Sequence, residues 1–87
     1  MSVFPLSMAA IGESVCLVTI LGGGKINQRL TALGLSPGVK LCILQDAGGP
    51  LMISVRGSRI ALGRGMAQKI MVRKVVENSK LSLGGIK

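Results

Sequence analysis

Residues 29–38 read Arg-Leu-Thr-Ala-Leu-Gly-Leu-Ser-Pro-Gly, and this stretch decides the fold. The pattern predicts a helix that ends at Leu33, because Gly34 readily adopts the left-handed conformation that terminates helices. Leu35 is then expected in the core. Pro37-Gly38 predicts a turn into a strand, since proline presets one φ angle and glycine accepts a positive one. The segment holds no group suited to catalysis, which favours a binding or regulatory module.

The helix before this turn is predicted over residues 25–33. Ile26, Leu30 and Leu33 recur at i, i+4 and i+7, the spacing of a single apolar stripe on a helix. We therefore expect all three side chains to face the core.

Short apolar runs with β-branched residues and period-two alternation predict about five strands. The expected strands cover residues 13–21, 39–43, 51–56, 59–62 and 70–75. Gly57-Ser58 is the expected tight turn between the third and fourth strands, and a helical turn is expected within 63–69. Before the first strand, Ser7 is expected to cap a single helical turn over residues 8–11.

These elements predict a mainly β fold, a small and partly open barrel with one short α-helix after the first strand. The length of 87 residues supports one domain. We place this domain at residues 1–76 and expect residues 77–87, which are polar and contain glycine, to form a flexible tail.

The charge of the chain points to an anionic partner. Eleven basic residues stand against three acidic ones, a net charge of +8, and 48% of the residues are apolar. Such a field favours an acidic protein face, an anionic membrane surface or nucleic acid. Phe4 is the only aromatic residue, so stacking of nucleobases on aromatic side chains has almost no basis here.

Catalysis, a resident metal and a bound cofactor find little support in the sequence. There is no histidine, and the carboxylates Glu13, Asp46 and Glu77 fall in separate segments. The glycines of 22–24 are followed by a lysine, but a phosphate loop needs a glycine where Thr19 stands and a hydroxyl residue directly after the lysine. We therefore expect no enzyme activity, no cofactor and no dedicated metal site.

The cysteines and the hydropathy pattern indicate a cytoplasmic protein. Cys16 and Cys42 form no C-x-x-C pair and are expected to be buried, reduced thiols. The sequence shows no basic segment typical of a signal peptide and no apolar run of the length needed to span a bilayer. We expect no direct membrane insertion.

Several short pieces of the sequence occur together in a characteristic order, from about Pro5 to Val72. They are Leu6, Ile11-Gly12, the glycines of 22–24, Arg29-Leu30, Leu33-Gly34-Leu35, Pro37-Gly38, Gly49-Pro50, Val55-Arg56-Gly57, Ile60-Ala61-Leu62, Ala67 and Ile70-Met71-Val72. In this order and spacing they resemble the ferrous iron transport protein A family (FeoA), whose members are small cytosolic partners of the bacterial ferrous iron permease.

The resemblance implies an SH3-like β-barrel and a role in ferrous iron uptake through binding to the cytoplasmic part of the FeoB permease, which carries a GTP-binding domain. A similar module ends the iron-dependent repressors. Descriptions of the family associate it with transition metals, but we carry no metal ligand over to this chain. Through such a partner the protein would be peripheral at the inner membrane.

Exposure and alternation, rather than the resemblance, suggest which residues would contact a partner. They are Lys25 and Arg29 on the helix, and Met52, Arg56 and Arg59 on the predicted hairpin. Exposed edge strands would also allow a homo-oligomer. Two other functions remain open at this point: a small basic nucleic-acid-binding barrel, and a soft-metal or redox sensor using Cys16 and Cys42.

Overall fold

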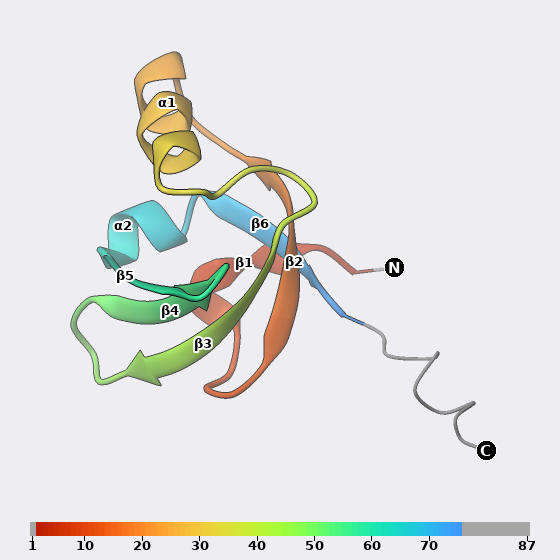
Figure 1. Ribbon diagram of the computed structural model, residues 1–87, viewed down its shortest axis with the longest axis vertical. Helices are drawn as coiled ribbons and strands as arrows, with labels where there is room; N and C mark the ends of the chain where they lie inside the picture. Colours follow the sequence, from red (N-terminus) through yellow and green to blue (C-terminus); the bar gives the residue numbers. More distant parts are fainter. Residues whose placement is uncertain (1, 76–87) are drawn as a thin grey trace.

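The computed structural model describes residues 2–75, which form one curled antiparallel sheet with a helix standing at one end (Figure 1). The elements in chain order are β1 (Phe4–Pro5), the 3₁₀ helix η1 (Leu6–Met8), β2 (Ser14–Ile20), α1 (Gly24–Ala32), β3 (Lys40–Asp46), β4 (Leu51–Val55), β5 (Ser58–Leu62), α2 (Arg64–Ala67) and β6 (Ile70–Lys74). The mainly β architecture with a short helix after the first long strand is confirmed. The helical turn expected within 63–69 is α2.

The sheet has six strands in the order β1-β6-β2-β3-β4-β5, and every pairing is antiparallel. The additional strand is β1, a two-residue segment that pairs with β6 through Phe4 opposite Val72 and Pro5 opposite Met71. Within residues 2–75 no pairing joins β5 to β1, so the sheet curls without closing. A proline suits β1 because an edge strand leaves one side of its backbone unpaired.

The core lies inside the curl and follows the strand alternation. Eleven large apolar side chains are fully buried. They are Leu6, Val15, Leu17, Leu30, Leu35, Ile43, Leu51, Ile53, Val55, Ile70 and Val72. Because successive side chains of a strand point to opposite faces, the residues between these positions form an outer sheet face.

The turn after α1 confirms most of the predictions made for residues 29–38. The Leu33 and Leu35 amides both donate to the Leu30 carbonyl, at 3.1 and 2.9 Å. Gly34 donates to the Thr31 carbonyl and has a φ of 93°, so it is the left-handed residue that ends the helix. Leu35 is completely buried.

The prediction for Leu33 was wrong, because this side chain is 48% exposed. The helix ends at Ala32, and Leu33 already has cap geometry. The apolar stripe of the helix therefore consists of Ile26 and Leu30 alone. Leu35, which follows Gly34, packs into the core instead. Leu30 is buried and Ile26 packs against the core, as expected.

Two local expectations elsewhere were also wrong. The N-terminal helical turn is η1, Leu6–Met8, rather than residues 8–11, and no side-chain cap is made; Pro5 precedes it with a φ of −67°. The β4–β5 turn consists of Arg56 and Gly57, because Val55 pairs with Ser58. Arg56 therefore stands in the turn and not at the end of a strand.

Residues 77–87, for which we expect a flexible tail, lie outside the described residues. No helix among residues 2–75 is long and apolar enough to cross a bilayer.

Candidate functional site

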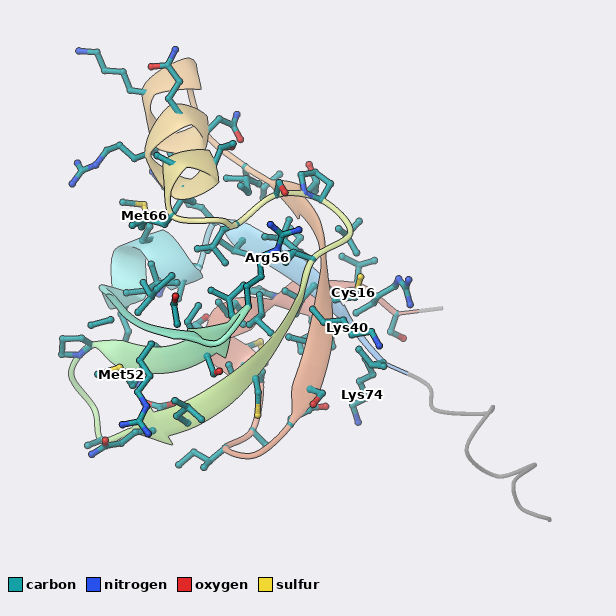
Figure 2. The ribbon with its side chains drawn as sticks, in the orientation of Figure 1. Cys16, Lys40, Met52, Arg56, Met66 and Lys74 are labelled. Carbon is teal, nitrogen blue, oxygen red and sulfur yellow. The ribbon has the colours of Figure 1, made fainter. Side chains whose placement is uncertain are left out.

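The five predicted contact residues divide between two parts of the molecule. Lys25 and Arg29 are exposed on α1. Met52 is half-buried on the outer face of β4, Arg56 is exposed in the β4–β5 turn, and Arg59 is exposed on β5. The structure thus brings three of them onto one hairpin, while α1 holds the other two at the end of the molecule (Figures 1 and 2).

Basic side chains cross the outer sheet face in register. Cys16 lies opposite Arg73 of β6 on one side and opposite Lys40 of β3 on the other. Leu41 is paired with Val55, so the residues next to that pair, Lys40 and Arg56, are neighbours across β3 and β4. Figure 2 shows Cys16, Lys40 and Arg56 near the region where β2 and β3 run together. The buried thiol of Cys16 is thus flanked by Lys40 and Arg73, and Arg56 lies one strand beyond Lys40.

Small side chains form the next row of the same face. Ser14 lies opposite Cys42, and Cys42 lies opposite Ser54. Together with the neighbouring cations they line a shallow depression of about 240 Å³, which we call the outer trough. Its lining residues are Ser14, Lys40, Leu41, Cys42, Ser54 and Arg56.

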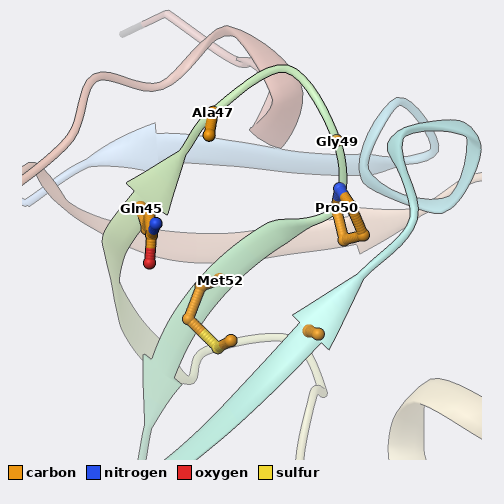
Figure 3. A pocket seen from close by; sticks show the side chains of 6 residues that line it. Gln45, Ala47, Gly49, Pro50 and Met52 are labelled. Atoms are coloured by element: carbon orange, nitrogen blue, oxygen red, sulfur yellow. The ribbon is translucent and has the colours of Figure 1, made fainter.

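A second depression adjoins this row on the β3–β4 side. It has a volume of about 290 Å³, and we call it the apolar pit (Figure 3). Its lining residues are Gln45, Ala47, Gly49, Pro50, Met52 and Ala61. Met52 lies opposite Ala61 of β5 and two positions before Ser54, so the pit and the outer trough occupy consecutive outward positions of β4.

The carboxylates within the described residues are both engaged away from the outer trough. Glu13 Oε2 lies 3.6 Å from Lys74 Nζ, and Glu13 Oε1 also accepts a hydrogen bond from the Ala10 amide. Asp46 forms an ion pair with Arg64 of α2. Residues 2–75 contain no third acid, so within this range Lys40, Arg56 and Arg73 have no carboxylate partner.

The two cysteines are free, Cys16 buried and Cys42 only half-buried, so the expectation of burial holds for Cys16 alone. Cys16 pairs with Lys40, whereas Cys42 pairs with Ser14, which makes the cysteines diagonal neighbours. Diagonal positions in a sheet have Cα atoms about 7–8 Å apart, beyond the usual span of a disulfide of about 4.4–6.8 Å. A disulfide between them would require the backbone to move.

Ligands for a transition metal do not gather in the part of the chain that the structure describes. No three residues among His, Cys, Asp and Glu stand close enough there to hold an ion. Glu13 and Asp46 are held by basic side chains, and the two thiols are the remaining donors of this kind. This donor set falls short of the three or four protein ligands of ordinary zinc sites.

Sequence reasoning left Lys40 and Arg73 out of the candidate contacts. A signal for Lys40 was available, because it alternates with the apolar Val39 and Leu41 and must therefore face outward. Arg73 alternates with Val72 in the same way. Their alignment in one row could not be predicted, since it depends on the registers of β2 with β3 and β6 and, for Arg56, of β3 with β4.

Comparisons with known proteins agree with this fold. The chain is 43% identical over 81 residues to a candidate Fe(2+) transport protein A of Methanocaldococcus jannaschii, covering 90% of this chain and 99% of that relative. It is also 43% identical to an iron uptake regulatory protein, FeoA, of known crystal structure. That match has a TM-score of 0.79 and covers 86% of this chain and all of the other. The expected SH3-like fold is thereby confirmed.

A manganese-dependent transcriptional repressor in complex with manganese contains the same fold. The match has a TM-score of 0.80 at 19% identity and covers 86% of this chain but 38% of the repressor. At this identity the likeness shows the fold alone. The FeoA domain model matches residues 4–74, nearly the whole of the described structure, and the chain therefore belongs to the FeoA domain family.

Proposed function

We propose that this chain is a non-enzymatic accessory protein of ferrous iron uptake, and that it acts by binding the cytoplasmic part of a FeoB-type iron permease. The observation that carries the proposal is the family match over residues 4–74. It is supported by the 43% identity to a relative whose name assigns it to Fe(2+) transport. The protein would then work in the cytoplasm and reach the inner membrane through its partner.

Docking, rather than chemistry, is the role that the side chains support. The outer sheet face presents basic groups, and the described carboxylates are held in ion pairs with Lys74 and Arg64. A surface of one charge sign steers an acidic partner and raises its association rate. Binding of this kind would tune the transport or nucleotide cycle of the permease.

We propose that Met52, Arg56 and Arg59 on the β4–β5 hairpin make the first contact with the permease. Lys25 and Arg29 on α1 form a second candidate contact of equal charge. The hairpin is favoured because it adjoins the outer trough and the apolar pit.

The role is tested in a strain that lacks this protein but keeps the permease. We expect ferrous iron uptake to fall and to return when the gene is restored. Unchanged uptake, with the permease assembled as before, would remove the proposed role.

The contact is tested separately, by capture of the permease from detergent extracts on the purified protein. Reversal of both charges in the variant Arg56→Glu/Arg59→Glu should weaken capture. For the wild-type protein, capture should fall as salt is raised, because salt screens exposed charges. Capture by the variant equal to wild type would remove these two arginines from the contact.

A further inference from the structure

We infer that the outer trough and the apolar pit together form one binding groove, and that its occupant is an extended acidic segment of a partner protein that also carries an apolar side chain. The inference rests on the proposed function in naming the permease as the partner. It deepens that function, because it assigns the chemistry of the bound segment and the face that receives it.

The floor of the groove allows a close approach of another chain. Ser14, Cys42 and Ser54 stand in register on three adjacent strands, which lie about 4.8 Å apart. Each of these side chains ends one atom beyond Cβ. A segment running along β4 would pass over Ser54 and beside Cys42, and would meet hydroxyl and thiol groups able to form hydrogen bonds.

The wall of the groove supplies the charge. Lys40 and Arg56 line the outer trough, and Arg73 lies opposite Cys16 in the same row. No carboxylate of residues 2–75 pairs with any of these three cations. Within this range, an incoming carboxylate would therefore not have to displace another carboxylate before it pairs with these cations. Arginine can bind it through two parallel hydrogen bonds.

The conformation of Arg56 is a second, independent indication. This residue has a φ of 54°, and it is the sole residue other than glycine with a positive φ among those described. Turns of this kind favour asparagine and glycine. A long basic side chain held in a disfavoured conformation is an outlier of the kind that clusters at binding sites.

The apolar pit identifies the second feature of the occupant. Met52 of β4 stands four residues before Arg56 of the β4–β5 turn, which places the pit at most about 13 Å from the cations at 3.3 Å per residue. An extended segment spans this distance with an acidic residue and an apolar residue four positions apart. Figure 3 shows the Met52 side chain lying between Gln45 and the β5 strand, and Met52 and Gln45 both line the pit.

This pairing of subsites favours a protein segment over other anions. Nucleic-acid backbones present phosphates that could meet Lys40 and Arg56, but they present no apolar group for the pit, and a bilayer keeps the acyl chains of its lipids beneath the headgroups. Phe4, the single aromatic residue, lies on β1 and not in the groove, so bases would have no ring to stack on.

The first test measures binding of the purified protein to the cytoplasmic part of the permease. The groove variant is Lys40→Glu/Arg56→Glu, and the matched control is Lys69→Glu/Lys74→Glu, which makes the same change of charge at two exposed lysines outside the groove. We expect the groove variant to lose at least about 10-fold in affinity and the control to lose less than about 3-fold. Far-UV circular dichroism and melting temperature show whether each variant folds.

A milder variant, Lys40→Gln/Arg56→Asn, serves if the charge reversal does not fold, because asparagine suits the turn. Equal affinities of the wild-type protein and both groove variants would overturn the groove while leaving the proposed function intact. Failure of the wild-type protein to bind the permease would instead remove the proposed function, and the peptide test below would still decide on the groove.

The second test uses synthetic eight-residue peptides. One carries two glutamates followed by a leucine four positions after the second, and the other has the same composition with the leucine beside the glutamates. We expect the first peptide to bind the wild-type protein more tightly than the second. The Met52→Ser variant and the Lys40→Gln/Arg56→Asn variant should each bind the first peptide more weakly than the wild-type protein does. Equal binding of the two peptides, or tighter binding of anionic lipid vesicles or single-stranded DNA than of either peptide, would overturn the assigned occupant.

Discussion

Arg56 and Gly57 occupy the two central positions of the β4–β5 turn, and both have positive φ angles, of 54° and 81°. A two-residue hairpin turn of this type matches the twist of the strands that it joins. Gly57 adopts the conformation without strain. In Arg56 the same conformation brings the Cβ atom too close to the backbone, which is unfavourable.

The first prediction concerns this strain. Arg56→Asn should raise the free energy of unfolding by about 1 kcal/mol, because asparagine tolerates the left-handed conformation. Urea denaturation followed by circular dichroism measures the change. Arg59→Asn is the control, since Arg59 lies in a strand, where asparagine is unfavourable. A loss of stability in Arg56→Asn would contradict the assignment of strain.

The second prediction uses two leucines that flank Gly34. Leu35 is fully buried and Leu33 is 48% exposed. Leu35→Ala should therefore lower the free energy of unfolding by about 2–5 kcal/mol through the cavity it leaves. Leu33→Ala should change it by less than about 0.5 kcal/mol. Chemical denaturation of both variants checks this difference, and the reverse order would place the wrong leucine in the core.

The third prediction concerns the end of α1. Gly34→Ala should destabilise the protein by about 1–2 kcal/mol, because the Cβ atom of an alanine at a φ of 93° would lie too close to the backbone. The nearest atom to an added Cβ there, Arg56 Cδ at 4.0 Å, makes only ordinary contact. Gly24→Ala should instead stabilise by about 0.4–1 kcal/mol, since Gly24 lies in α1 with open space around it. Melting temperatures that move the same way in both variants would refute this account.

The fourth prediction separates the two thiols. Cys42 is half-buried and should react with Ellman's reagent in the folded protein, whereas the buried Cys16 should react only as the protein opens. The rate for Cys16 should rise in urea, and Cys42→Ser should remove the fast phase alone. Mild oxidation should give no intramolecular disulfide by mass spectrometry, because the cysteines are diagonal neighbours. Equal rates for the two thiols, or a mass loss of two hydrogens, would show a different arrangement.

The sequence predicted best those features that a single residue determines. Gly34 ends a helix because of its own conformational freedom, and Ile53 and Val55 alternate because strands have a period of two. Both features were confirmed. The fate of Leu33 depended on where the helix stops within one turn, which periodicity does not resolve.

Features that depend on partners distant in the chain were harder to predict. The two-residue strand β1 exists because β6 offers an edge beside it, and Phe4-Pro5 alone carries no strand signal. The β4–β5 turn was misplaced by one residue because arginine is rare at a positive φ. For the candidate site, sequence reasoning proposed the hairpin residues Met52, Arg56 and Arg59, and their contact with a partner stays a prediction. It left out Lys40 and Arg73, because their alignment on either side of Cys16 depends on the registers of β2 with β3 and β6.

The position of β6 between β1 and β2 has a consequence for synthesis of the protein. This strand comes last among the described elements, yet it pairs with the first two strands. A nascent chain therefore cannot complete its sheet until residue 74 has left the ribosome. Until then β2 keeps one bare edge, flanked by apolar side chains that would aggregate if exposed for long. The sheet is thus expected to fold only after its last described strand has been synthesised.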